Sequence, residues 1–131
     1  MNQRDDDFKY LVEQACSTLS LTHQAVKEKF ITYPVCYMQY RKNGMHSDSV
    51  EVSFDKIEAS VTFDISQENI CFHACIHFYN TKDEDLFIRY LTQSANHYSY
   101  RKKVWIVNDY FTIELEEGTN GLHFYCYKME K

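Results

Sequence analysis

The segment Cys71–Phe78, with the sequence CFHACIHF, holds the side chains of this chain that are best suited to chemistry. Side chains alternate between the two faces of a strand, so Cys71, His73, Cys75 and His77 would share one face. Residues two apart in a strand are separated by roughly 7 Å and residues four apart by roughly 13 Å, whereas zinc lies about 2.0–2.3 Å from each ligand. At most two of the four can therefore share an ion.

His73, Cys75 and His77 are thus candidate metal ligands only if another strand or helix completes the site. The side chains that could do so are His97, His123 and Cys126. Without such a contribution, the same pattern predicts a half-buried sheet face of small polarizable residues, or a surface that meets a partner. The sequence alone leaves these interpretations open.

Signatures of common enzyme classes are absent from the sequence. There is no Gly-x-Ser-x-Gly nucleophile motif and no papain-type cysteine motif. The chain has only three glycines, which argues against a phosphate-binding loop. The acidic groups within 83–85 and 114–117 are explained by a helix start and a turn. We therefore expect no cofactor, and a binding protein is better supported than an enzyme.

The composition is that of a single domain covering residues 1–131. Fourteen basic and 19 acidic side chains give a formal charge of −5, which argues against nucleic acid as a partner. The basic cluster at 101–103 is explained by a cap at the end of a preceding helix. Five cysteines, an odd number, predict buried free thiols in a reducing cytoplasm. The charged amino-terminal residues form no secretory signal, and no apolar run reaches the roughly 20 residues that span a membrane.

Two amphipathic helices are predicted. The first follows the acidic residues 5–7 and has apolar residues at helical spacing, namely Phe8, Leu11, Val12, Ala15 and Leu19. Residues 22–30 either extend this helix or form a second short one before Pro34. The other amphipathic helix begins at Thr81, where Glu84 three residues later predicts a capping box.

Turn signals divide the remaining chain into antiparallel hairpins. Asn43-Gly44 separates strands at 35–42 and 47–55, and Asn108-Asp109 separates strands at 104–107 and 110–115. Residues 61–65 and 70–79 form another hairpin, and a last strand covers 122–129. The predicted fold is an α+β two-layer domain, with a mainly antiparallel sheet of about five to seven strands and two amphipathic helices packed on one face.

Several of these strands carry aromatic or apolar residues on both faces. Trp105 stands between two apolar neighbours, and His123, Tyr125 and Tyr127 alternate with apolar residues in the last strand. One helical layer cannot cover two apolar faces, so these four residues are predicted to form an interaction surface or a homodimer interface. Sheet curvature, with the amino-terminal helix on the second face, would bury them instead.

The order helix, antiparallel strands, capped helix, antiparallel strands resembles the secretion-chaperone-like α+β fold of type III secretion chaperones and YbjN-like bacterial proteins. The local similarity runs from Ala95-Asn96-His97 through residues 103–107 to Ile113-Glu114, an asparagine near a helix end followed by a hairpin. The resemblance implies a small acidic dimer that binds another protein and catalyses no reaction. It transfers no role to a specific residue.

The expected function is that of a non-enzymatic cytoplasmic protein-binding module, chaperone-like, an adaptor or an inhibitor of a partner protein, that forms a homodimer. The enrichment of Tyr, Trp and Phe at protein interfaces supports this expectation. The alternative is a small-molecule-binding domain or a metal-dependent enzyme with its site near the strand at Cys71–Phe78. No membrane is expected among the partners.

Overall fold

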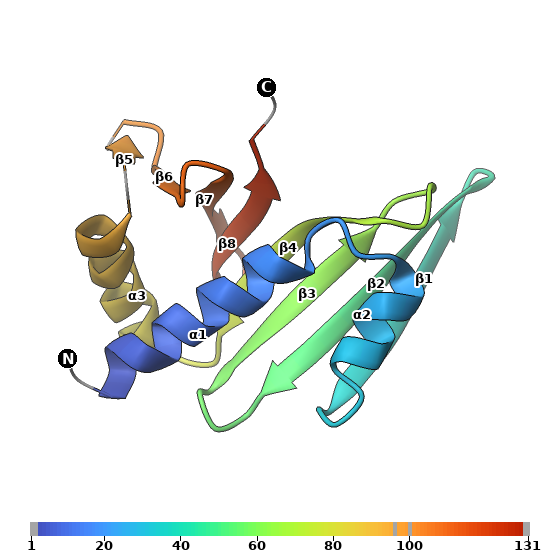
Figure 1. The fold of residues 1–131 in the computed structure, drawn as a ribbon, viewed down its shortest axis with the longest axis horizontal. Helices are drawn as coiled ribbons and strands as arrows, with labels where there is room; N and C mark the ends of the chain where they lie inside the picture. Colours follow the sequence, from blue (N-terminus) through green and yellow to red (C-terminus); the bar gives the residue numbers. More distant parts are fainter. Residues whose placement is uncertain (1–2, 96, 100, 130–131) are drawn as a thin grey trace.

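The computed structural model describes residues 3–95, 97–99 and 101–129. Within these residues the chain forms three helices, α1 (Gln3–Thr18), α2 (His23–Lys29) and α3 (Thr81–Ser94), together with eight strands (Figure 1). The strands are β1 (Val35–Lys42), β2 (Met45–Phe54), β3 (Ala59–Ile65), β4 (Cys71–Phe78), β5 (His97–Ser99), β6 (Val104–Val107), β7 (Phe111–Gly118) and β8 (Gly121–Lys128). None of these helices combines the length and apolar character needed to cross a membrane.

All the strands belong to one open antiparallel sheet with the order β1-β2-β3-β4-β8-β7-β6-β5. Neighbouring strands in the sheet are also neighbours in the sequence, except for β4 and β8. The α+β class with an antiparallel sheet is therefore confirmed, although the described residues form eight strands where the sequence predicts five to seven. The additional strand is β5, which is too short to show an alternating pattern. Asn96, part of the resemblance given above, lies outside the described residues.

The two predicted tight turns are confirmed. Asn43 and Gly44 have φ angles of 53° and 79°, and Asn108 and Asp109 have φ angles of 55° and 62°. Two successive positive φ angles match the twist of the flanking strands, and asparagine, aspartate and glycine adopt them most readily. Asn43-Gly44 therefore connects β1 to β2, and Asn108-Asp109 together with Tyr110 connects β6 to β7.

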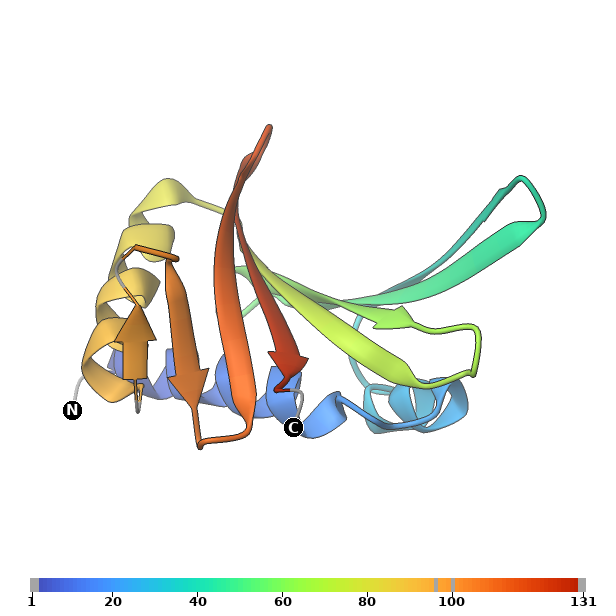
Figure 2. The same cartoon turned by 90° about the horizontal axis from the view of Figure 1, so that it is seen from above.

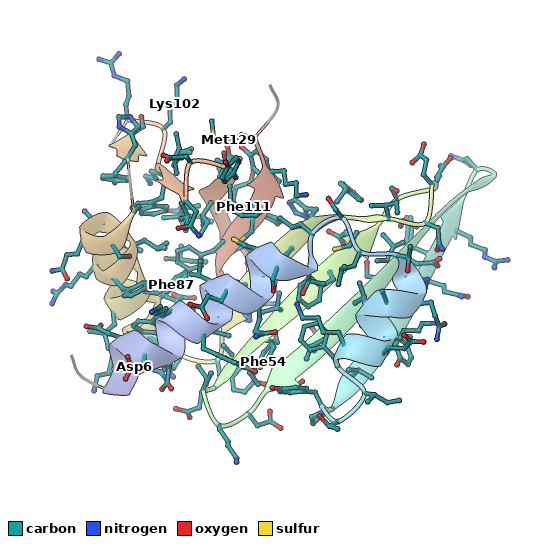
Figure 3. The ribbon with its side chains drawn as sticks, viewed as in Figure 1. Asp6, Phe54, Phe87, Lys102, Phe111 and Met129 are labelled. Atoms are coloured by element: carbon teal, nitrogen blue, oxygen red, sulfur yellow. The ribbon has the colours of Figure 1, made fainter. Side chains whose placement is uncertain are left out.

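Apolar side chains of α1 and α3, and Phe30 just after α2, form a layer that contacts strands of the sheet. In α1 and the turn after it, the predicted stripe is entirely buried. Figure 2 shows α1 and α2 along the same side of the sheet, and Figure 3 shows Phe87 extending from α3 towards α1. Ring contacts join this layer to the strands, with centroid distances of 5.7 Å for Phe8 and Phe78, 5.2 Å for Phe30 and Phe63, and 4.8 Å for Phe87 and Phe124.

The segment after α1 forms a separate short helix rather than an extension. Ser20 has a φ angle of 79°, which ends α1. Thr22 then caps α2, because its hydroxyl accepts a hydrogen bond from the backbone N–H of Ala25 at 3.1 Å. Val26 of α2 is buried, so the helix is anchored to the core by its apolar side.

The start of α3 differs from the predicted capping box. Its cap is Asn80, whose side-chain oxygen accepts a hydrogen bond from the backbone N–H of Asp83 at 2.9 Å. Glu84 is buried instead, and it accepts a hydrogen bond from the backbone N–H of Leu122 in β8 at 2.8 Å. Gly121 precedes this contact with a φ angle of +125°, and a Cβ atom there would lie 2.7 Å from the Glu84 carboxylate. Only glycine fits that position without strain.

The basic cluster at 101–103 is not a helix cap. The helix α3 ends at Ser94, and the chain forms β5 before it reaches Arg101. The cluster lies in the exposed connection between β5 and β6, where Lys103 has a φ angle of 53°. The prediction is wrong because the residues after α3 pair with β6 as a strand instead of continuing the helix.

Arg4 fastens the first turn of α1 to two other parts of the fold. Its guanidinium forms an ion pair with both carboxylate oxygens of Asp83 at the start of α3, and it donates to the carbonyl of Ile57 at 2.9 Å. It also lies 3.1 Å from the carboxylate of Asp7 and 5.0 Å from the centre of the Phe8 ring. Asp83 is buried, and Arg4 supplies the cation with which its carboxylate pairs.

Candidate functional site

The pairing of β4 with β8 joins the two halves of the sheet, and we call it the seam. In it Cys75 lies opposite Tyr125. The residues on either side of them are buried against the helices, namely Ala74, Ile76, Phe124 and Cys126. The side chains that alternate with these buried residues along β4 and β8 therefore point to the opposite surface, which we call the outer face. The seam residues of the outer face are all half-buried: His73, Cys75, His77, His123, Tyr125 and Tyr127.

The structure thus brings the three candidate metal ligands and three of the four predicted surface residues together on two adjacent strands. Figure 2 shows that this part of the sheet turns its outer face away from α1 and α2. Because these residues are far apart in sequence, no local pattern reveals that they are neighbours. The non-sequential pairing of β4 with β8 alone creates the cluster.

Cys71 does not share the outer face with His73. The register between β3 and β4 shifts, so that Asp64 lies opposite His73 while Ile65 lies opposite Cys71. Phe72 is the extra residue of this bulge, and its side chain is 55% exposed, whereas Cys71 is buried. The predicted alternation is therefore wrong for these two residues, because a bulge interrupts the period of two.

A chain of polar contacts crosses four strands on the outer face. The Ser49 hydroxyl donates to the carboxylate of Asp64 at 2.8 Å, and the other oxygen of that carboxylate lies 2.9 Å from Nδ1 of His73. The His73 ring stacks on Tyr125 with a centroid distance of 4.8 Å. The Tyr125 hydroxyl in turn lies 3.3 Å from Nδ1 of His123. These contacts fix the rings in place and direct Nε2 of His73 away from its carboxylate partner.

Cys75 lies within this group but is not an activated nucleophile. Burial, and then the nearby charge of Asp64, raise the pKa of its thiol to about 12. Burial also raises the pKa of the adjacent Tyr125 hydroxyl, and negative charge around it acts in the same direction. Both groups remain protonated at neutral pH. A protonated thiol is a poor nucleophile and a poor metal ligand.

The candidate metal ligands are divided between two environments. His73 pairs with Asp64, whereas His77 lies at the other end of the seam, where its ring meets His123 edge-on at 5.3 Å. Nε2 of His77 lies 3.3 Å from the carbonyl oxygen of Asn120. In the part of the chain that the structure describes, no three His, Cys, Asp or Glu side chains are placed to hold a metal ion. Of the completing residues considered, Cys126 is buried on the helix side and His97 lies in β5.

A pocket lies on the outer face beside the bulge. The two strands of the seam pair through only three residues, and the pairing ends at Ala74 and Cys126. The pocket has a volume of about 620 Å³ and is lined by Phe72, His73, Thr112, Tyr127, Lys128 and Met129. Aromatic and aliphatic walls with one imidazole and one ammonium group suit an inserted side chain or a small molecule.

A second pocket lies between α1 and the connection from α2 to β1. Its volume is about 490 Å³, and its lining includes Tyr10, Tyr33, Phe54 and Asp55. The hydroxyls of Tyr10 and Tyr33 are hydrogen-bonded to each other, and this bond raises the pKa of Tyr10 to about 12. The two hydroxyls therefore satisfy one another. No sequence motif pointed to this pocket.

Trp105 does not belong to the outer face. Its side chain is 0% exposed and stacks on Tyr98 at a centroid distance of 5.0 Å. Its indole N–H donates to the hydroxyl of Thr92 in α3 at 3.2 Å. The prediction that Trp105 forms an interaction surface is therefore corrected: it lies on the helix side. Alternation shows which residues share a face, but it does not show which face is covered.

The site also includes residues that the sequence did not single out. Asp64 and Ser49 connect the polar chain, and Phe72, Lys128 and Met129 line the pocket. Asp64 alternates with apolar residues in its strand, which marks it as outward-facing but does not identify its partner. Only the register of β3 against β4 places it opposite His73.

All five cysteines are free, but they differ in accessibility. Cys36 is exposed, which contradicts the prediction of buried thiols, whereas the others are buried or half-buried. Burial raises the pKa of Cys16 to about 12 and that of Cys71 to about 11, so little thiolate forms near pH 8. With Ellman's reagent at pH 8 we expect Cys36 to react before the other four thiols in the native protein, and all five to react after denaturation. Rapid reaction of a native Cys36→Ser variant would contradict this assignment.

The outer face of the seam therefore combines a polar chain, stacked rings and an open pocket within a few neighbouring strands. No family model, curated protein or solved structure matches the chain, so its own geometry carries the functional interpretation.

Proposed function

We propose that this protein is a non-enzymatic protein-binding module, and that the outer face of the seam is its binding surface. The observation that carries the proposal is that half-buried rings lie on the side of the sheet facing away from α1 and α2, with an open pocket beside them at the end of the seam. Aromatic and methionine side chains gathered on such a surface are typical of interaction sites. A reducing cytoplasm suits a chain with five free cysteines.

The pocket is the proposed anchor point. An apolar side chain of the partner would enter between Phe72 and Met129, which are 55% and 41% exposed and would lose water contact on binding. Lys128 and His73 would then pair with carboxylate or carbonyl groups beside the anchor. The partner is therefore expected to present an apolar side chain flanked by acidic residues.

The polar chain supports this role by holding the surface in one arrangement. His73 is fixed on one side by Asp64 and on the other by the Tyr125 ring. Side chains that are already ordered lose little conformational entropy when a partner binds. The raised pKa of Cys75 also favours a binding role over nucleophilic catalysis at this position.

A pair of matched variants tests the proposal. Tyr127→Ser with Met129→Ser removes two walls of the pocket, whereas Ile31→Ser removes a 78% exposed apolar side chain that lines neither pocket. Proteins captured from the source cytoplasm by cross-linking to the unaltered protein should be retained by Ile31→Ser and lost by the double variant. Equal unfolding midpoints would establish that both variants fold. Identical capture by the double variant would contradict the proposal.

The pocket and the Asp64–His73 pair also favour a second candidate, a small-molecule-binding domain. A carboxylate or phosphate ligand would accept a hydrogen bond from Lys128, and also from Nε2 of His73 when the imidazole carries both protons. Such ligands should raise the thermal unfolding midpoint of the unaltered protein but not that of His73→Ala. A midpoint that no ligand of either class changes would remove this candidate.

A further inference from the structure

The two edges of the sheet differ in how well they are protected. β5 forms one edge with three residues, whereas β1 forms the other with eight. Within the described residues β1 has a strand on one side only. Natural proteins block long edge strands with proline, bulges or inward charges, because an open edge pairs readily with another strand. The β1 edge has none of these devices between Val35 and Gln39, and Figure 2 shows its hairpin projecting from the body of the fold.

The hydrogen-bonding groups on this edge can be assigned from the register. The backbone N–H of Ser53 donates to the carbonyl of Pro34 at 2.9 Å, so the residue before β1 points towards β2. In an antiparallel pair, hydrogen-bonded and non-hydrogen-bonded positions alternate. Every second residue from Pro34 therefore bonds to β2. The backbone groups of the residues between them point to the open edge, namely Val35, Tyr37, Gln39 and Arg41.

From this pattern we infer that β1 pairs with β1 of a second copy of this chain, antiparallel and centred on Met38. In that register Tyr37 lies opposite the second copy's Gln39, and Val35 lies opposite its Arg41. All four residues whose backbone groups point to the open edge are then paired, with about eight backbone hydrogen bonds between the copies. Registers centred on Cys36 or Tyr40 leave half of these residues without an opposite residue, so the edge is most complementary to itself around Met38.

The side chains of β1 agree with this register. Tyr37, Met38 and Tyr40 are 53%, 40% and 62% exposed, which is high for large apolar or aromatic side chains. In the paired edge the two Met38 side chains meet on the symmetry axis, and Tyr40 meets the second copy's Cys36. Sulfur and aromatic rings pack favourably in such contacts. Arg41 lies at opposite ends of the antiparallel pair in the two copies, so the two Arg41 side chains do not face each other.

This inference concerns a different surface from the proposed binding face and does not depend on that function. The sequence predicts a homodimer through the outer face, whereas pairing through β1 joins two sheets edge to edge. The seam and its pocket lie several strands away from β1 and stay accessible in each copy. A dimer of this kind would present two binding surfaces.

Charge exchange at Met38 tests the inference, because in the paired edge Met38 lies opposite Met38 of the second copy. Light scattering should give twice the chain mass of 15.7 kDa for the unaltered protein. Met38→Glu and Met38→Lys should each shift to the monomer mass, and an equimolar mixture of the two should recover the dimer mass. Arg41→Glu is the matched control. Arg41 lies on the same strand but far from Arg41 of the second copy, so this variant should remain a dimer.

Oxidative cross-linking fixes the register independently. Met38→Cys in a Cys36→Ser background should form a disulfide-linked dimer, whereas Cys36 of the unaltered protein should not, because it lies opposite Tyr40. A monomer at all concentrations, dimers of both charged variants, or a disulfide through Cys36 would each overturn the inference. If a charged variant fails to fold, hydrogen exchange of the unaltered protein decides the same question. The amides of Tyr37 and Gln39 should become more protected as the protein concentration rises. Absence of this protection would also overturn the inference.

Discussion

Replacing Trp105 with alanine should lower the free energy of unfolding by about 3–5 kcal/mol. The indole is fully buried, stacks on Tyr98 and approaches Phe124 with a centroid distance of 6.5 Å. Its removal would leave a cavity between α3 and the sheet and would also leave the Thr92 hydroxyl without its indole donor. Urea denaturation followed by circular dichroism measures the change, since the only tryptophan is lost.

An exposed aromatic residue provides the control for this prediction. Tyr110 is 67% exposed, so Tyr110→Ala should change the free energy of unfolding by less than about 0.5 kcal/mol. In the unaltered protein, the fluorescence of Trp105 should shift to longer wavelength on unfolding because the indole then meets water. Equal unfolding midpoints for the Trp105 and Tyr110 variants would show that Trp105 is not part of the core.

The second large effect is expected at the ion pair between Arg4 and Asp83. Arg4→Ala should lower the free energy of unfolding by about 2–4 kcal/mol, because it leaves the Asp83 carboxylate buried without its cation. The Arg4 side chain is 23% exposed, so water weakens the pair and the loss should fall short of that for a fully enclosed one. Arg4→Lys should not restore stability, because an ammonium cannot reproduce the forked contacts with Asp83 and the Ile57 carbonyl.

A double-mutant cycle separates this pair from the rest of the network. The combined Arg4→Ala and Asp83→Ala variant should be more stable than the sum of the single changes predicts, by about 1–2 kcal/mol. Asp7→Ala is the control, because Asp7 contacts the same guanidinium but is itself more exposed. It should cost less than about 1 kcal/mol. Strict additivity of Arg4 and Asp83 would show that the two charges do not stabilise each other.

Local sequence signals predicted the elements whose causes are local. The φ angles of Asn43, Gly44, Asn108 and Asp109 require residues that tolerate the left-handed region, and the sequence supplies them at both turns. The apolar spacing of α1 likewise identifies its buried side. These features depend on a few consecutive residues, so they are visible without knowledge of the fold.

The remaining features depend on which strands meet. The bulge at Phe72 arises from the register against Ile65, and nothing within CFHACIHF indicates it. Trp105 faces the helices because β6 lies beside β7 and beneath α3, a relation that strand alternation does not contain. At the start of α3 two residues, Asn80 and Thr81, could each cap the helix. Glu84 accepts a hydrogen bond from the backbone N–H of Leu122, so it does not form the capping box.

The candidate site shows the same division. Alternation correctly placed His73, Cys75 and His77 on one side of β4, and His123, Tyr125 and Tyr127 on one side of β8. It could not show that the two sets are adjacent, since β4 and β8 are separated by α3 and three strands in the sequence. The sequence did not identify Asp64 for the same reason, because Asp64 belongs to the site only by lying opposite His73.

The single pairing between distant strands also sets the order in which the molecule can be assembled. The strands β1–β4 and β5–β8 form two successive meanders, and every pairing inside each one links sequence neighbours through a short connection. Joining β4 to β8 instead closes a long segment of chain, which costs conformational entropy and forms only three residue pairs. We therefore expect this joining to be the late, slow event in folding. Because the outer-face site spans the two meanders, a chain with nearly all its strands formed would still lack its binding surface, and competence to bind would report that folding is complete.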